Sequence, residues 1–484
     1  MSTTYETPIT DNTAPFYCEQ HSRFDEQAET LRQQILDLPD TVKAADGGKT
    51  IYISYRGDDA ADGRTPATAW RTTENLKDKE LLAEGDAVLF ERGGIYRSVC
   101  VILCDGVGYG AYGNGPKPQL FAGDKNYADP ALWERIDQWG VWRTRVPADP
   151  KNRDNAWRND IGNIIFDHGR GCASEHKRTA LSELRTDFEF YHDVQENWLY
   201  LCHSMGNPGE RFDSIEIAPK VNILTAPYQN HGIVIENLCL KYTGAHAIGM
   251  SRPEGCVVRG CEIGYIGGSM LKDNARYGNG IELYSRCKDI VVEYNWIYEC
   301  FDAGYTHQGR DGWHENVVIL HNLMEYSNYN IEVWTSRDPA VGGARNGVIE
   351  DNILRFAGYG FGTKARIGSN SSAVGNISMY NYPLPHRDFV IRNNILDCST
   401  RYLVSIAYPN DPEGRGPTIE GNIWNQKPYH TADSAAAVNR LNKHVSADPD
   451  ERPQTIVLPC SSQEEMEAGV AKTDLAPLEI TYEG

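Results

Sequence analysis

The sequence predicts an all-β protein whose main body is a right-handed parallel β-helix with an inserted β-sandwich-like domain and an N-terminal capping helix. The first observation is a short phrase, a β-branched residue three positions before Asn, which recurs at 234–237, 258–261, 292–295, 319–322, 349–352, 391–394 and 419–422. Cys261 replaces Asn in the second copy, and most copies continue with a second β-rich run. Copies of one small unit that cannot bury its own apolar face must stack.

The Asn of the phrase is the second observation. In a parallel β-helix each coil places a strand about 4.8 Å above the one before, so equivalent residues form ladders. An Asn ladder at a bend joins side-chain amides from coil to coil and tolerates the left-handed backbone that bends require. A sandwich of antiparallel strands, the alternative, gives turn signals about every 8–12 residues without a fixed phrase. The phrase therefore favours the β-helix.

The chain divides into five segments. Residues 1–45 contain a helix over 19–38, ended by Pro39, whose apolar face comprises Phe24, Ala28, Leu31 and Ile35. We expect this helix to cap the first coil and protect its open edge. Residues 46–116 form the first coils. Residues 117–222 lack the phrase and carry alternating runs with several Trp, which predicts antiparallel strands of an inserted β-sandwich-like domain. The main β-helix covers 223–430, and 431–484 cap its last coil.

Composition restricts the partners. A formal charge of −20 argues against nucleic acid and anionic membranes, which require a positive surface. No run of about 18 apolar residues predicts a membrane span. The first residues lack the features of a secretory signal, and twelve Cys form no disulfide framework, so we expect a cytoplasmic protein with reduced thiols. No metal-ligand spacing is present, so we expect no metal or cofactor. Homo-oligomers remain an open possibility.

The second β-rich runs define a candidate site, because side chains alternate across a strand. One column then faces inward, comprising Ile248, Ile281, Tyr305, Ile331 and Phe361. A first outward column comprises Gly249, Glu282, Thr306, Glu332 and Gly362. A second outward column comprises Ser251, Tyr284, Gln308, Trp334 and Lys364. Aromatic rings beside carboxylates and amides suit a sugar, which has an apolar face and many hydroxyl groups.

The carboxylates suggest glycoside cleavage. Two coil steps separate the backbones of Glu282 and Glu332 by roughly 10 Å, near the carboxylate spacing of inverting glycosidases. Asp302, at the turn before the intervening strand, offers a third carboxylate for the closer spacing of a retaining pair. We expect Glu332 to be the general acid and Asp302 or Glu282 the nucleophile or base. Expected substrate contacts are Tyr284, Trp334, Gln308, Thr306, His307, Lys364 and Arg366.

Three of these contacts have competing interpretations. His307 falls in the inward register, where a core role competes with a substrate contact. Lys364 and Arg366 are interpreted either as salt-bridge partners of the carboxylates or as ligands of an acidic sugar.

The order of early coils, β-rich insertion and main helix resembles the β-xylosidase glycoside hydrolase family. The run at 50–73 also resembles the opening of carbohydrate-active β-helix proteins. The family resemblance implies an acidic residue on each of two adjacent coils, and the run at 331–333 resembles the strand of the general acid. The adjacent run at 305–308 has no carboxylate at the nucleophile position, and Asp302 lies just before it.

We therefore expect a glycoside hydrolase that acts on short, mainly neutral oligosaccharides. A lyase or epimerase acting on uronate-containing sugars is the first alternative, with Lys364, Arg366 or Tyr284 as the candidate group that abstracts the C5 proton. A non-catalytic glycan-binding solenoid is the second alternative.

Overall fold

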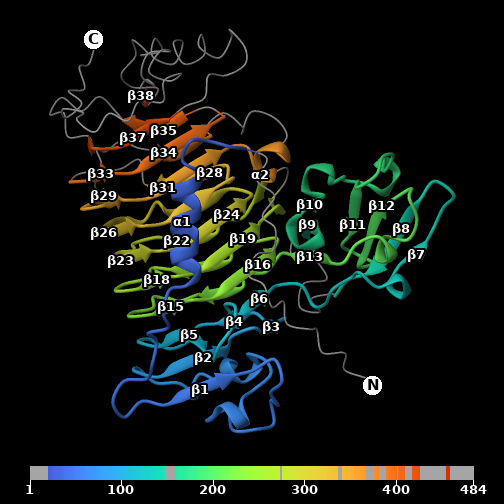
Figure 1. Cartoon of the computed structure of the whole chain (residues 1–484), viewed down its shortest axis with the longest axis horizontal. Helices are drawn as coiled ribbons and strands as arrows, with labels where there is room; N and C mark the ends of the chain where they lie inside the picture. Colours follow the sequence, from blue (N-terminus) through green and yellow to red (C-terminus); the bar gives the residue numbers. More distant parts are fainter. Residues whose placement is uncertain are drawn as a thin grey trace.

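The computed structural model describes residues 20–147, 160–272, 275–335, 341–366, 374–380, 388–400, 402–408, 417–425 and 454–457. Three long sheets of parallel strands run along one axis, and in each complete coil the chain passes through sheets A, B and C in turn (Figure 1). The predicted parallel β-helix is confirmed. No helix among the described residues is long and apolar enough to cross a membrane.

The strands of the three sheets stack coil on coil. Sheet A contains β1 (Thr50–Ile53), β2 (Ala87–Glu91), β5 (Gly108–Tyr112), β15 (Val234–Glu236), β18 (Val257–Arg259), β23 (Lys288–Glu293), β26 (Gly312–Leu320), β29 (Gly342–Arg345), β30 (Val348–Glu350), β33 (Val390–Arg392) and β36 (Thr418–Glu420). Sheet B contains β3 (Ile95–Tyr96), β6 (Gln119–Phe121), β16 (Cys239–Thr243), β19 (Glu262–Ile266), β24 (Trp296–Cys300), β27 (Leu323–Glu325), β31 (Ile353–Ala357), β34 (Ile395–Ser399) and β37 (Ile423–Asn425). Sheet C contains β4 (Cys100–Val101), β14 (Leu224–Ala226), β17 (Ile248–Ser251), β22 (Ile281–Tyr284), β25 (Ala303–Gln308), β28 (Tyr329–Trp334), β32 (Gly375–Tyr380), β35 (Tyr402–Tyr408) and the antiparallel β38 (Gln454–Val457).

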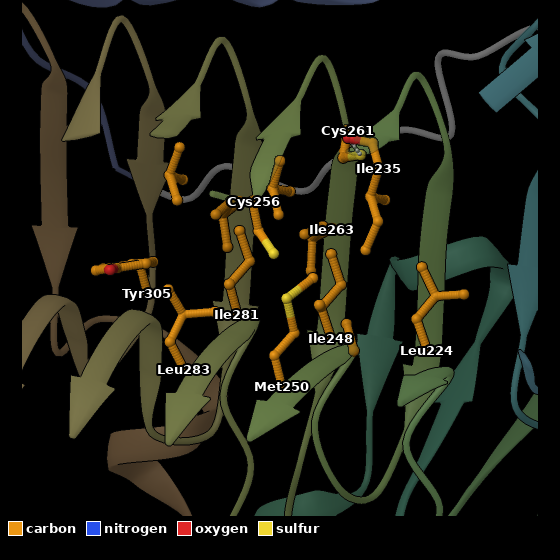
Figure 2. Close-up of a cluster of buried hydrophobic side chains, with 14 of the residues drawn as sticks. Leu224, Ile235, Ile248, Met250, Cys256, Cys261, Ile263, Ile281, Leu283 and Tyr305 are labelled. Carbon is orange, nitrogen blue, oxygen red and sulfur yellow. Dashed lines mark hydrogen bonds between the residues drawn. The ribbon is translucent and has the colours of Figure 1, made fainter. Parts of the chain in front are cut away.

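The core fills the inside of the coils. Figure 2 shows apolar side chains from successive coils, among them Ile248, Ile281 and Tyr305, pointing into this interior. All three are fully buried, and each such side chain contributes roughly 1.5–3 kcal/mol when it leaves water. Ten cysteines among the described residues are free thiols, and Cys239, Cys261, Cys287 and Cys300 are buried, as the repeats predict.

The Asn ladder forms over five copies of the phrase, Asn295, Asn322, Asn352, Asn394 and Asn422. In each step one side-chain oxygen accepts both the backbone and the side-chain N–H of the Asn one coil below, as Asn322 does from Asn295 at 2.9 and 3.0 Å. The left-handed residue of each bend is not the ladder Asn but the residue before it, such as Tyr294, His321 and Asp351. The ladder therefore satisfies buried amides beside the strained position.

The first copy of the phrase, at 234–237, lies one residue out of register with the second copy, at 258–261. β15 pairs Glu236 with Arg259, so Asn237 lies opposite Gly260, and Leu238 lies opposite Cys261. Asn237 has a left-handed backbone, with φ 57°, and stands outside the ladder. Its side chain accepts a hydrogen bond from Lys117 at 2.6 Å and donates to the Leu38 carbonyl at 3.0 Å. Asn237 therefore ties the N-terminal segment to the solenoid.

Replacing Asn322 by alanine should lower the free energy of unfolding by roughly 3 kcal/mol, because several buried donors and acceptors lose their partners. The Asn322 amide donates to the Val292 and Leu320 carbonyls and to Asn352, each at 2.9 Å. Denaturant unfolding measures the loss. Asn346→Gly is the control, because Asn346 is exposed and its φ of 53° suits glycine. Equal small losses in both variants would contradict a stabilising ladder.

Helix α1 (Asp25–Leu36) does not cap the first coil, which corrects the expectation for residues 1–45. It lies lengthwise on the outside of sheet B (Figure 1), with Ala28 and Ile35 buried beneath it. Arg32 donates to Glu325, and Arg355 pairs with Asp25. The outer face of sheet B carries buried charged and aromatic side chains that need polar partners, and α1 supplies them. The expected C-terminal cap lies outside the described residues apart from β38.

Three insertions leave the solenoid at the corner between sheets B and C. The largest lies between β6 and β14 and forms two antiparallel sheets around a shared apolar core, built from β7 (Glu134–Arg135), β8 (Val141–Arg145), β9 (Ile161–Phe166), β10 (Gly171–Cys172), β11 (Phe190–Asp193), β12 (Trp198–Cys202) and β13 (Ile215–Pro219). The hairpin of β20 (Ser269–Lys272) and β21 (Ala275–Tyr277) follows β19, and α2 (Phe361–Lys364) follows β31. Short 3₁₀ turns are η1 (Pro66–Thr68), η2 (Glu74–Lys77), η3 (Pro130–Leu132), η4 (Asp167–Gly169), η5 (Ser174–His176), η6 (Leu181–Glu183) and η7 (Pro208–Glu210).

Helix α2 corrects the last copy of the predicted columns. Phe361, Gly362 and Lys364 belong to α2 rather than to a strand of sheet C. The strand of that coil is β32, which pairs Ile377 with Ile331 and Ser378 with Glu332. The sequence pattern predicts a strand at this insertion because its Tyr-Gly-Phe-Gly run, at 359–362, has the composition of the earlier runs.

Candidate functional site

The outer face of sheet C brings the predicted carboxylates and aromatic residues together. The strand register stacks Gly249, Glu282, Thr306, Glu332 and Ser378 in one outward column. It stacks Ser251, Tyr284, Gln308 and Trp334 in the next. From β17 to β28 this register matches the alignment made from the sequence. Glu282 and Glu332 are thus two coils apart, with Thr306 between them.

Glu332, Asp302 and Arg366 form the first part of the site. Glu332 is 2% exposed and accepts a hydrogen bond from the Thr306 hydroxyl at 2.9 Å. Arg366 pairs with Asp302 at 2.5 Å and donates to the Phe301 carbonyl at 3.2 Å. Burial alone would lower the pKa of Arg366, but the charges of Asp302, Tyr329 and Glu332 raise it above the usual value. One guanidinium therefore interacts with both carboxylates.

Glu282 forms the second part, one coil below Thr306. His246 Nε2 lies 2.5 Å from one of its oxygens, and the Gln308 amide donates to the other. The backbone N–H of Asn279 donates to His246 Nδ1 at 3.1 Å, which leaves the proton of a neutral ring on Nε2, facing Glu282. Burial would raise the pKa of Glu282, but His246 and Gln308 together hold it below the ordinary value. Glu282 is therefore a fixed, ionised carboxylate.

This low pKa makes part of the protein's stability depend on pH. A carboxyl whose pKa is lower in the folded state stabilises the fold above its unfolded pKa, near 4.5, and the contribution is lost as pH falls through the folded pKa. The difference in unfolding free energy between wild type and Glu282→Gln should therefore shrink as pH falls from about 4.5 to below the lower pKa of the folded state. Denaturant unfolding at a series of pH values measures it, and a difference that stays constant over this range would contradict the proposed contacts.

The aromatic residues beside the carboxylates differ in exposure. Tyr284 is 48% exposed and follows Glu282 by two residues. Trp334 is partly buried, and the Arg310 guanidinium lies 5.1 Å from its ring centroid. The Tyr277 ring meets the His246 ring edge to face, with 5.0 Å between centroids. An exposed ring next to fixed carboxylates is the surface that a sugar needs.

Two predicted substrate contacts lie elsewhere. His307 is fully buried inside the solenoid, where its Nδ1 lies 3.1 Å from the Tyr305 hydroxyl, so the core interpretation holds. Lys364 lines a cavity at the B–C corner together with Tyr359 and Glu299. Thr306 and Gln308 reach the outer face but serve first as hydrogen-bond donors to Glu332 and Glu282. Arg366 lies at the site as the partner of Asp302.

Sequence reasoning missed His246 and Arg276. His246 stands before its strand, and it reaches Glu282 of the next coil only because Asn279 holds its ring. Arg276 lies in the β20–β21 hairpin, and its guanidinium is 4.8 Å from the Phe301 ring, the same distance as that of Arg366. The one available signal was the long interval between the second and third phrases, which contains this hairpin. Among the described residues no group of three or more His, Cys, Asp or Glu is arranged to hold a metal ion.

Several solved structures align with the chain at low sequence identity. The complex of XylC with xylose aligns with a TM-score of 0.41 and 12% identity, over 78% of this chain and 76% of that chain. A glycoside hydrolase aligns with a TM-score of 0.45 and 11% identity, over 78% of this chain and 94% of that chain. Pectate lyase Pel9A aligns with a TM-score of 0.36 and 11% identity, over 93% and 96%.

These neighbours include a glycoside hydrolase and a pectate lyase. They do not confirm the specific resemblance to the β-xylosidase family. No protein-family model matches the chain, and no curated protein matches it. The activity of this chain is therefore inferred below from its own side chains.

Proposed function

We propose that the outer face of sheet C is the active site of a glycoside hydrolase that cleaves short, mainly neutral oligosaccharides. The observation that carries the proposal is the outward column in which Glu282 and Glu332 lie two coils apart, with the Asp302–Arg366 ion pair at the turn before the strand between them. These carboxyl groups, beside Tyr284 and Trp334, provide both the groups for cleavage and a surface for the sugar ring.

Glu332 is the general acid in this proposal. It is almost fully buried and accepts a hydrogen bond from the Thr306 hydroxyl, so its carboxyl group is held in place on the outward column, where it can give a proton to the leaving oxygen. Asp302, with Arg366 as its counter-ion, supplies the carboxylate that attacks the sugar directly or through water. Glu282 is fixed by His246 and Gln308 and accepts hydrogen bonds from sugar hydroxyl groups. Tyr284 and Trp334 contact the apolar face of the ring.

The lyase alternative loses two of its three candidate bases in this arrangement, and Tyr284 alone remains on the outer face. Lys364 lies in the corner cavity, and Arg366 is engaged with Asp302. A neutral substrate also agrees with the formal charge of −20, because an acidic protein repels polyanions.

Turnover of a panel of aryl glycosides and short neutral oligosaccharides tests the function. Release of reducing ends by wild type and its loss in Glu332→Gln is the expected result. Unsaturated products that absorb in the ultraviolet would overturn the proposal in favour of a lyase. Binding of sugars without either product would overturn it in favour of a glycan-binding solenoid.

A further inference from the structure

A cavity, named here the seam cavity, lies where the inserted domain meets the solenoid, at the corner between sheets B and C. It encloses about 200 Å³. One wall is the turn from Gly169 to Cys172 of the inserted domain, and the opposite wall is formed by Tyr359, Phe361 and Lys364 around α2. Its floor is formed at the carboxyl ends of β19, β24 and β27 in sheet B. Neither Glu282 nor Glu332 lines it, so it is separate from the carboxylate face.

Hydrogen bonds hold the walls of this seam cavity in place. The Tyr265 hydroxyl donates to the Gly169 carbonyl, and a Cβ on Gly169 would lie 2.5 Å from the Tyr265 ring. Gly169 also has φ 105°, a conformation that favours glycine. On the other side, the backbone N–H of Phe361 donates to Glu299 at 2.8 Å. The cavity is therefore formed before any ligand binds.

The floor contains a strained column with one unusual residue. Each coil bends from sheet B toward sheet C through a residue of left-handed backbone, and these residues are Tyr242, Tyr265, Glu299, Tyr326, Phe356 and Cys398. Glu299 is the single charged member of the described column. It stands between Tyr265 and Tyr326, and all three line the cavity. Glu299 therefore places a carboxylate between two tyrosine side chains on the floor of the cavity.

The lining has the chemistry of a saccharide site. Tyr265, Tyr326 and Tyr359 offer aromatic surface to the apolar face of a sugar ring. Arg170 and Lys364 offer donors for hydroxyl groups, while Glu175 and Glu299 offer acceptors. Charged groups of both signs disfavour a purely apolar ligand, and the balance of two cations against two carboxylates favours a neutral polar ligand over an ion.

We propose that the seam cavity binds one residue of a neutral saccharide, apart from the site of cleavage. The class of ligand rests on the proposed function, whereas the site rests on its own walls. Helix α2 forms one wall, and Arg366, which pairs with Asp302, follows two residues after Lys364. A bound sugar therefore contacts the segment that holds the counter-ion of the active site.

Filling the cavity tests the proposal. Gly171 lines the cavity, and a Cβ there meets no heavy atom within 4 Å, so Gly171→Trp should fill the space without strain. Ser182→Trp, on an exposed 3₁₀ turn of the same domain, is the control. Amide hydrogen exchange, resolved by peptide mass spectrometry, is measured with xylose, glucose, galactose, N-acetylglucosamine, cellobiose and lactose. Glu332→Gln is measured in parallel.

At least one of these sugars should slow exchange in residues 169–176 and 359–366 of wild type, Ser182→Trp and Glu332→Gln, and this protection should be lost in Gly171→Trp. Protection confined to the strands of sheet C, protection that survives in Gly171→Trp, or no protection by any sugar would overturn the proposal. Turnover separates the two proposals. A protein that hydrolyses the panel without protection at 169–176 has the active site alone, and protection without turnover leaves the seam site alone.

Discussion

Replacing Glu332 by glutamine should lower kcat on the best oligosaccharide substrate by roughly 10²–10⁴-fold, the usual contribution of a general acid. Glutamine keeps the size of the side chain and the acceptor for Thr306, so the fold should be retained. Initial rates with saturating substrate measure the effect. Glu293→Gln is the matched control, because Glu293 lies on sheet A, away from the carboxylate face. A loss of less than tenfold in Glu332→Gln would contradict the assigned role.

Arg276 is the residue through which the three corner insertions meet. Its guanidinium donates to the Gly162 and Ser174 carbonyls of the inserted domain at 3.0 Å, to the Gly268 carbonyl at 2.6 Å and to the Ala365 carbonyl at 3.2 Å. Burial lowers the pKa of Arg276 to about 10, so the group remains charged near neutrality. It thereby links the inserted domain to the segment that carries Arg366.

Arg276→Met should lower the free energy of unfolding by roughly 3–5 kcal/mol, because methionine fills the space of the stem but leaves buried carbonyl groups without donors. Denaturant unfolding measures this loss. Limited proteolysis should cut the inserted domain faster in the variant, because its attachment to the solenoid is weakened. Arg276→Lys, which keeps the charge but has fewer donors, should fall between the two. An unfolding free energy within about 1 kcal/mol of wild type would show that the insertions are held in another way.

The repeated coils of the fold could be predicted from the sequence because each coil buries apolar side chains in the same pattern. Apolar alternation placed Ile248, Ile281, Tyr305 and Ile331 in one inward column, and the structure agrees over those coils. The prediction of the columns was wrong at α2, because this corner insertion has the amino-acid composition of a strand. It also slipped by one residue at Asn237, because an Asn follows a β-branched pair there without being in the ladder.

The site was only partly readable for a related reason. The alternation of side chains along each strand showed which of them point outward from sheet C. This was enough to place Glu282, Glu332, Tyr284 and Trp334 on the same face. The alternation does not show which side chains reach this site from segments at the corner between sheets B and C, and so His246 and Arg276 were missed. Lys364 was misplaced because its position depended on the strand that α2 replaced. The position of α1 depended on buried charges such as Arg355, which a sequence pattern does not reveal.

The dependence of Glu332→Gln on the leaving group tests the central claim most directly. A general acid matters most when the departing oxygen is strongly basic. The variant should therefore hydrolyse a dinitrophenyl glycoside at nearly the rate of wild type and should lose most activity on the corresponding oligosaccharide. Equal rates for wild type and variant on both substrates would place the chemistry away from the outer face of sheet C.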